Sequence, residues 1–297
     1  MADKEAWKNR IIKDLKEKDF NELISNTEDG IEILPFYTTD DNHKYQLEIP
    51  TTSYQDCLNT AIVKVSDAKA ANAQAIQLLQ QGIQAIIFDV ENKDITQLDV
   101  DVLVQDIQAE YAPIFFDNYI QTSKHILEDK IPKSTISKIY VPQQKSKVNE
   151  LLYALLRIYH SDETQFRVHF IVGQNFFLEV AKFRAFRWLL AQLNRLHQSN
   201  KEITLIAETG FENRSDDVLE NNILRNTTET MSAILGACFG IIVHPHENTN
   251  LGNRIARNVK NILSLESNFK IEEEFTKGSY YVEYLTYQLA QKTWDKL

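Results

Sequence analysis

The stretch VHFIVGQNFFLEVAKFRAFRWLLAQLNRL, residues 168–196, contains the pattern that decides the fold. It opens with a mainly apolar run of strand length, residues 168–172, and then continues as a long amphipathic helical pattern over residues 176–196. An apolar run without alternation is typical of a strand that is covered on both faces, as in a parallel sheet. The stretch therefore predicts one β-strand followed by one α-helix.

Similar units occur along most of the chain. Six further apolar runs lie at residues 60–65, 85–90, 113–116, 137–141, 203–207 and 240–243. Helical patterns follow most of them, at residues 70–81, 149–159, 222–235 and 254–265. Such alternation requires a parallel sheet, and seven or eight units in one domain favour a closed barrel over an open doubly wound sheet. We expect an α/β fold of the (β/α)8 TIM-barrel class.

The composition indicates how the chain is divided. Only 8 Gly and 6 Pro occur among 297 residues, so no flexible or proline-rich linker separates domains. The polar, turn-rich stretch at residues 40–50 is the one plausible seam. We therefore predict an extended N-terminal arm over residues 1–50 and a barrel domain over residues 51–297.

Charge and cysteine content exclude several classes of function. The net charge of -10 disfavours nucleic acid and anionic membranes as partners, since both attract clustered Lys and Arg. Two cysteines, Cys57 and Cys238, cannot form a disulfide framework or a four-thiolate zinc site. Residues 1–20 are charged throughout, unlike a secretory signal, and no stretch reaches the roughly 18 apolar residues of a spanning helix. We expect a cytoplasmic protein.

Polar residues follow the strand runs and mark where a site is expected, because the carboxyl ends of barrel strands carry the chemistry. Candidate catalytic residues are Asp89, Glu208, His244 and His246. Asp89 and Glu208 could pair as general acid and base, although an orienting role for Asp89 and a solvated Glu208 are favoured. His244 and His246 could bind zinc or iron, but further ligands cannot be identified, and we expect no metal.

Two basic features also allow two interpretations. Arg225 could bind an anion at a helix start, or it could support the barrel rim by pairing with Asp216 or Asp217. Lys182, Arg184 and Arg187 form a stripe that we interpret as the solvated face of an outer helix. Cys238 lies in an apolar run, so we expect a small buried side chain.

Several segments together resemble the methylmalonyl-CoA mutase family. They are TEDGIEILPFYT (27–38), AANAQA (70–75), AIIFDV (85–90), FFLEVAKFRA (176–185), LRNTTETMSAILGA (224–237), RIARN (254–258) and GSYYVEYLT (278–286). The resemblance is strong over residues 1–40 and 173–297, fair over 59–90 and weak over 91–165. It implies a TIM barrel whose N-terminal arm embraces another subunit.

The resemblance also implies an activity and a cofactor. The family interconverts methylmalonyl-CoA and succinyl-CoA by a radical route with adenosylcobalamin, which a separate domain holds through an Asp-x-His-x-x-Gly loop; this sequence contains no such loop. The family's catalytic Tyr-His pair falls near residues 138–141, where Tyr140 could stand for the tyrosine, but no His occurs over residues 126–159. The family's Gln-Thr-Ser turn reads Ala207-Glu208-Thr209 here. Tyr140, Thr209 and Arg225 remain weak candidates for substrate contact.

The strand composition supports the same interpretation. A mutase barrel needs an axial tunnel lined by small residues, whereas runs such as Ile86-Ile87-Phe88 and Ile114-Phe115-Phe116 predict a packed interior. We expect a small subunit with a degraded catalytic site. It would bind no cofactor itself and would pair, through its arm and barrel, with a large catalytic subunit that carries adenosylcobalamin.

Two alternatives remain open. The first is a stand-alone, mutase-like barrel enzyme that acts through the residues at its strand ends. The second is a module that binds a CoA ester without converting it; Lys182, Arg184 and Arg187 would then be candidates for contact with the CoA phosphates.

Overall fold

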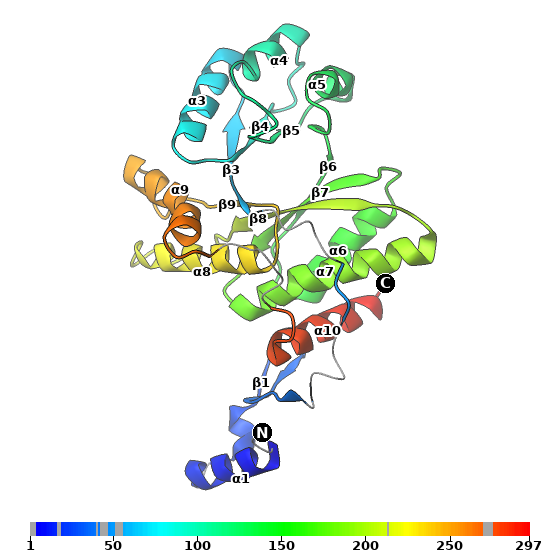
Figure 1. Ribbon diagram of the computed structural model, residues 1–297, viewed down its shortest axis with the longest axis vertical. Helices are drawn as coiled ribbons and strands as arrows, with labels where there is room; N and C mark the ends of the chain where they lie inside the picture. Colours follow the sequence, from blue (N-terminus) through cyan, green and yellow to red (C-terminus); the bar gives the residue numbers. More distant parts are fainter. Residues whose placement is uncertain are drawn as a thin grey trace.

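The computed structural model describes residues 4–16, 19–39, 41, 47–50, 56–212, 214–269 and 276–297. Seven parallel strands and their helices form the body of the molecule, and the N-terminal segment extends from one end of it (Figure 1). The predicted seam at residues 40–50 falls largely outside the described residues. Among those that are described, no helix combines the length and the apolar character needed to cross a bilayer.

The strands form one parallel sheet in the order β5-β4-β3-β9-β8-β7-β6, in which β3, the first of these strands along the chain, pairs with β9, the last, as in a barrel. Each predicted apolar run falls on one strand, so the α/β barrel prediction is confirmed. The barrel is not fully closed: the described residues contain seven barrel strands rather than eight, and β5 and β6 do not pair. The strands are β3 (Leu58–Lys64), β4 (Ala85–Asp89), β5 (Ile114–Asp117), β6 (Ser137–Val141), β7 (Gln165–Val172), β8 (Glu202–Thr209) and β9 (Gly240–Ile242).

Helices follow the strands in turn. α10 (Tyr280–Trp294) packs against α7 and α6. Helices α4 and α5 have seven residues each, too few to show a helical period, which explains why the sequence pattern missed them. The other elements are α3 (Ala68–Gln80), α4 (Gln97–Leu103), η2 (Gln121–Ser123), α5 (Lys124–Lys130), α6 (Lys147–Tyr159), α7 (Phe176–His197), α8 (Asn221–Leu235) and α9 (Asn250–Leu265).

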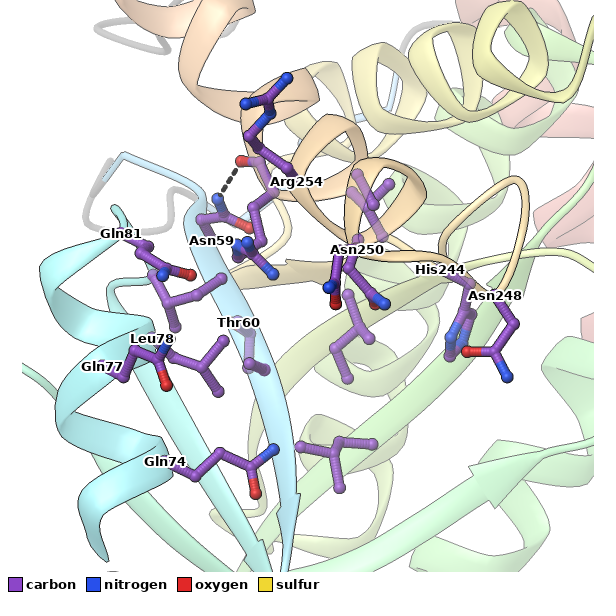
Figure 2. Close-up of a pocket in the computed structure, with 18 of the residues that line it drawn as sticks. Asn59, Thr60, Gln74, Gln77, Leu78, Gln81, His244, Asn248, Asn250 and Arg254 are labelled. Carbon is purple, nitrogen blue, oxygen red and sulfur yellow. Dashed lines mark hydrogen bonds between the residues drawn. The ribbon is translucent and has the colours of Figure 1, made fainter. Parts of the chain in front are cut away.

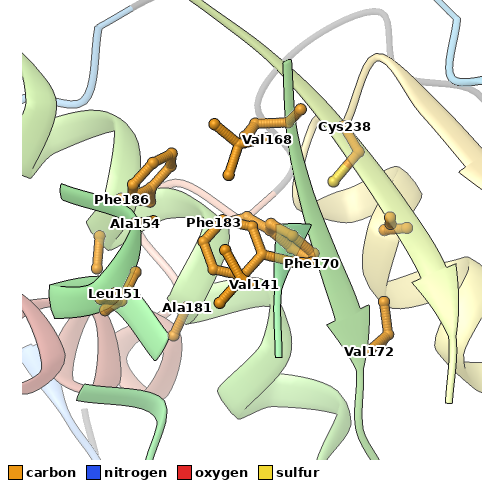
Figure 3. Close-up of a cluster of buried hydrophobic side chains, with 14 of the residues drawn as sticks. Val141, Leu151, Ala154, Val168, Phe170, Val172, Ala181, Phe183, Phe186 and Cys238 are labelled. Carbon is orange, nitrogen blue, oxygen red and sulfur yellow. The ribbon is translucent and has the colours of Figure 1, made fainter. Parts of the chain in front are cut away.

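The barrel consists of two halves with separate hydrophobic cores (Figure 1). In the first half, β3, β4 and β5 carry α3, α4 and α5, and Phe88 stacks on Phe116 at a centroid distance of 5.7 Å. In the second half, β6 to β9 carry α6 to α10. Its core contains Phe170, which meets Phe186 edge to face at 5.2 Å (Figure 3). Cys238 is buried in this core, as predicted.

Two joints connect the halves. At the first joint, β3 pairs with β9 over only two residue pairs, Leu58 with Gly240 and Asn59 with Ile241. The side-chain amide of Asn59 also donates, through Nδ2, to the carbonyl of Arg257 in α9 at 2.8 Å. At the second joint, between β5 and β6, one backbone hydrogen bond joins the segments, from Phe116 N to Ser134 O at 2.9 Å. The backbone therefore holds the halves together weakly at both joints.

The prediction of a solvated basic stripe on the helix at residues 176–196 is wrong. Lys182 and Arg184 are 0% and 1% exposed, and Arg187 is buried as well. Lys182 Nζ contacts Glu150 Oε2 at 2.8 Å, and Arg184 contacts Glu283 at 2.9 Å. Glu150 lies on α6 and Glu283 on α10, so these ion pairs hold α7 against both of its neighbouring helices. Burial of Lys182 and Arg184 is tolerated because each has a hydrogen-bonded carboxylate partner, and Arg187 Nη1 donates to the carbonyl of Gly236.

The N-terminal segment contains α1 (Lys4–Leu15), η1 (Phe20–Leu23), β1 (Ser25–Asn26) and β2 (Glu32–Ile33). Its second part packs on the barrel: Ile31 is 1% exposed, and Asp29 accepts hydrogen bonds from Ser146 Oγ at 2.5 Å and Lys147 N at 2.9 Å at the start of α6. Its first part stands away from the barrel (Figure 1). Helix α1 has no buried residue, and Trp7 stacks only within the segment, on Phe36 at 4.6 Å.

The joint between β3 and β9 gives a test of the fold. A Cβ at Gly240 would lie 2.5 Å from Thr60 Oγ1 and 3.2 Å from Ile206 Cδ1, so Gly240→Ala would force β9 away from β3. We expect the free energy of unfolding to fall by about 1–3 kcal/mol, as for other overpacking changes. Urea unfolding monitored by circular dichroism measures this, with Ala73→Ser on the exposed face of α3 as control. Equal stability of Gly240→Ala and the wild type would contradict this account of the joint.

Candidate functional site

The interior of the barrel is divided into an apolar layer and a charged layer. The apolar layer consists of Ile87, Phe115, Ile206 and Ile242, packed against Ile62, Ile136 and Phe239. Side chains alternate between the two faces of a strand, so the next inward positions after Phe115 and Ile206 are Asp117 and Glu208. With Lys138, Arg167 and His169 from β6 and β7, these two carboxylates form what we call the charged layer.

Asp117 is the centre of one part of the charged layer. Its carboxylate is 2% exposed and contacts Lys138 Nζ at 2.6 Å, and it also forms an ion pair with Arg167. The Arg167 guanidinium is fully buried and lies over the Phe115 ring, 4.7 Å from its centroid. Burial lowers the pKa of Arg167 to about 9, so the guanidinium is still charged at pH 7.

His169 connects Arg167 to Glu208. Arg167 Nε donates to His169 Nε2 at 3.1 Å, and His169 Nδ1 lies 2.9 Å from Glu208 Oε1. Because Nε2 accepts, the neutral ring carries its proton on Nδ1 and donates it to Glu208. The second carboxylate oxygen of Glu208 lies 3.4 Å from His244 Nε2. A hydrogen-bonded chain thus runs from a buried guanidinium to His244, whose side chain is 23% exposed.

Burial and hydrogen bonding shift the titration of this chain. Burial lowers the pKa of His169 to about 4, against the opposing effect of Glu208, so the ring is neutral at pH 7. Burial would raise the pKa of Glu208, but hydrogen bonds from His169 and His244 outweigh it and lower that pKa to about 2. With His169 neutral, the two carboxylates of the charged layer balance the charges of Lys138 and Arg167.

The structure brings some of the predicted site residues together and separates others. Glu208 meets His244, and Thr209 Oγ1 accepts from the His244 amide at 2.9 Å. Tyr140 is 46% exposed and lies opposite His169 in the strand register; burial and the charge of Glu208 raise its pKa.

The other candidates lie apart from this chain. Asp89 contacts Asn118 Nδ2 at 2.7 Å and forms no hydrogen bond or ion pair with Glu208. His246 faces Glu247 at 3.8 Å. Arg225 donates to Asn222 within α8 at 3.0 Å. Among the described residues, no group of three or more His, Cys, Asp or Glu side chains is placed to hold a metal ion.

The sequence pattern missed Lys138, Arg167 and His169 as members of the site, and it did not select Asp117 as a candidate although this residue lies at the end of β5. The signal that could have found them is alternation: Arg167, His169 and Ile171 occupy one face of β7, and Lys138 and Tyr140 occupy one face of β6. A search limited to strand ends does not find polar residues in mid-strand. A histidine does lie beside Tyr140. It is His169, which comes from the neighbouring strand β7.

The hydrogen bonding limits what this site can do chemically. Both ring nitrogens of His169 are engaged, by Arg167 and by Glu208, and the ring is fully buried. Glu208 stays ionised and accepts from two imidazoles, which makes it a poor base. His244 and Tyr140 are the exposed members of the group, and Phe211 covers one face of His244 at a centroid distance of 4.5 Å. The arrangement fixes side chains in place rather than presenting a free acid and base.

Comparison with known proteins bears on the resemblance. The family described as Methylmalonyl-CoA mutase matches residues 156–297. The methylmalonyl-CoA mutase small subunit of Porphyromonas gingivalis is 26% identical over an alignment that covers 98% of this chain and 61% of that protein. The predicted resemblance to the methylmalonyl-CoA mutase family is confirmed.

Further relatives match a shorter part of the chain. The methylmalonyl-CoA mutase of Rhizobium meliloti is 35% identical over 42% of this chain and 19% of that protein. The methylmalonyl-CoA mutase large subunit of Propionibacterium freudenreichii subsp. shermanii is 36% identical over 42% and 18%. The chain thus spans about three fifths of the small subunit and about one fifth of these two proteins. A solved structure of Yersinia pestis DHPS aligns with a TM-score of 0.33 and 13% identity over 72% of this chain and 94% of that chain, too distant to bear on function.

The titration of His169 predicts how stability depends on pH. Between pH 6.5 and about 4 the unfolded imidazole binds a proton that the folded one does not, so stability falls as pH falls through this window. The loss from Glu208 comes lower, as pH falls from 4.5 towards 2. We expect His169→Gln to reduce the slope of the free energy of unfolding against pH in this window by up to about 1.4 kcal/mol per pH unit. Urea unfolding at a series of pH values measures this, with exposed His125→Gln as control. Parallel curves for His169→Gln and the wild type would show that His169 does not control this loss.

Proposed function

We propose that this chain acts as the small, non-catalytic subunit of a methylmalonyl-CoA mutase, in complex with a large subunit that carries adenosylcobalamin and performs the isomerisation. The observation that carries the proposal is the state of the barrel interior. An apolar layer fills one level, and the fully buried Arg167 and His169 occupy the next. A thioester arm threading the axis would have to displace these side chains and leave Asp117 and Glu208 without their partners.

The residues near Tyr140 support a non-catalytic role for this chain. Val141 follows Tyr140 and is 1% exposed, with its side chain in the core of the second half. His169 lies beside Tyr140 in the register, but its nitrogens are bound by other side chains. The imidazole of His169 is therefore not free to act on a substrate next to Tyr140.

The cofactor is assigned to the partner for a related reason. The sequence contains no Asp-x-His-x-x-Gly loop, and the described histidines nearest the strand ends do not fit a corrinoid ligand. His244 is bonded to Glu208 and packs against the tilted ring of Phe211, and His246 is 8% exposed. No step of the proposal passes through a cofactor on this chain.

The N-terminal segment supports a partner contact. Helix α1 stands away from the barrel and buries none of its residues, although it carries Trp7, Ile11 and Ile12 (Figure 1). Ile12 and Leu23 are 44% and 39% exposed. Apolar side chains that remain accessible on a projecting segment are typical of a surface that is covered in a complex.

Assembly with a large subunit tests the proposal. We expect the chain, mixed at micromolar concentration with the large methylmalonyl-CoA mutase subunit from the same genome, to elute as one complex in size-exclusion chromatography. Separate elution would overturn the proposal. We also expect no turnover when the isolated chain is supplied with adenosylcobalamin and methylmalonyl-CoA, whereas turnover would favour the stand-alone enzyme.

The contribution of the N-terminal segment can be tested separately. Ile12→Asp combined with Leu23→Asp leaves the contacts of Ile31 and Asp29 with the barrel intact, and it should raise the dissociation constant of the complex by about tenfold or more. Tyr111→Asp, at a position that is 81% exposed, is the matched control. Biolayer interferometry against the immobilised large subunit measures both. An unchanged affinity in the double variant would place the contact elsewhere, on the barrel.

A further inference from the structure

A groove of about 1190 Å³ runs between α3 and α9, where the first and last strands of the barrel meet (Figure 2). β3 and β9 pair directly over two residue pairs, and beyond Asn59 and Ile241 the two strands no longer pair; the groove lies along this unpaired stretch. Its floor includes Ile62 and Ile242, which also belong to the apolar layer of the interior.

One side of the groove is an open strand edge. β3 pairs with β4 as far as Lys64 with Asp89, but it pairs with β9 only as far as Asn59 with Ile241. Leu58 N donates to Phe239 O on the β9 side, and Asn59 O accepts from Gln84 N on the β4 side. Backbone N–H groups two residues apart point to the same side of a strand. Those of Ile62 and Lys64 therefore point to the same side as that of Leu58, towards the groove. An unpaired edge of this kind is a template for another strand.

The walls have a distinct chemistry. Among the described residues that line the groove there are three cations, Lys64, Arg254 and Arg257, and one imidazole, His244, but no Asp, Glu, Phe, Tyr or Trp side chain. The guanidinium groups of Arg254 and Arg257 form no hydrogen bond or ion pair with any described residue, whereas Lys64 lies 3.7 Å from Glu91. Carboxamides line the groove on both sides (Figure 2): Gln74 and Gln77 on α3 with Gln81 directly after it, and Asn250 at the start of α9 with Asn248 just before it.

We propose that this groove docks an extended, acidic peptide segment of a partner protein, which pairs as an added strand with the edge of β3 that is open beyond Asn59. The edge supplies main-chain hydrogen bonds, as in other cases of strand addition. The carboxamides, which both donate and accept, suit the amide groups of a peptide. The two free guanidinium groups suit its carboxylates. Alternate side chains of the strand would face the apolar floor at Ile62 and Ile242. The inference does not depend on the proposed function.

A synthetic peptide tests this directly. The probe is a fluorescein-labelled, end-blocked peptide of about ten residues, the upper length of common strands, in which Glu alternates with Val. Two comparison peptides carry N-methyl groups on alternate amides, or Lys in place of Glu. We expect saturable binding of the probe by fluorescence anisotropy and weaker binding of both comparison peptides. Arg254→Glu should weaken binding by about tenfold, whereas Arg195→Glu at the exposed end of α7 should not change it.

Hydrogen exchange locates the contact. We expect the amides of Ile62 and Lys64 to exchange rapidly in the free protein and to be protected when the probe binds. Absence of binding at millimolar probe, equal binding of the N-methylated peptide, or displacement by inorganic pyrophosphate with no change at Ile62 would overturn the proposal. Protection of these amides in the free monomer would show that the chain fills its own groove. Protection that rises with protein concentration would assign the groove to a second copy.

Discussion

Strands β5 and β6 do not pair with each other. At this seam a buried carboxylate provides the contact that backbone hydrogen bonds between strands provide elsewhere in the sheet. Asp117, at the end of β5, holds Lys138 of β6 and Arg167 of β7 across this gap. A charge this deeply buried is tolerated only while its partners remain in place, so the two halves of the barrel are fixed relative to each other by complementary charge. The shape of the interior depends on this contact, because Arg167 in turn positions His169 and covers Phe115.

This arrangement has a consequence for function. In most TIM barrels the polar groups at the strand ends are available to a ligand. Here Asp117, Lys138, Arg167, His169 and Glu208 are engaged mainly with one another, although Arg167 Nη1 is buried without a hydrogen-bond partner among the described residues. A fold does not by itself determine function, and the same barrel can carry a reaction or only a surface. Because the polar groups inside this barrel are bonded to one another, we expect binding at its outer surfaces, namely the projecting helix α1 and the groove beside α9.

The sequence predicted the strands well because each is an apolar run buried on both faces, as residues 168–172 illustrate. It did not predict the charged layer, since Arg167 and His169 interrupt such runs and their partners Asp117 and Glu208 lie on other strands. The same reason explains the error at Lys182 and Arg184: a single helix cannot show that Glu150 and Glu283 will neutralise them. Glu208 and His244 were both candidates because they follow strand ends, and their side chains lie 3.4 Å apart, but the expectation of a solvated Glu208 is wrong because the residue is buried. Their role in holding His169 required the three-dimensional arrangement.

The number of strands links the two seams. A ring of parallel strands has a fixed relation between strand number, tilt and stagger, so a sheet with one strand fewer must narrow or open. This sheet opens at two places, and the two openings are treated differently. At β5 and β6 a carboxylate inside the barrel neutralises the cations that face it. At β3 and β9 no described carboxylate lines the gap or pairs with Arg254 or Arg257, and the edge of β3 is unpaired beyond Asn59. One opening is thus closed from within by the chain's own charges, and the other has the charge and the hydrogen-bonding groups to be closed from outside.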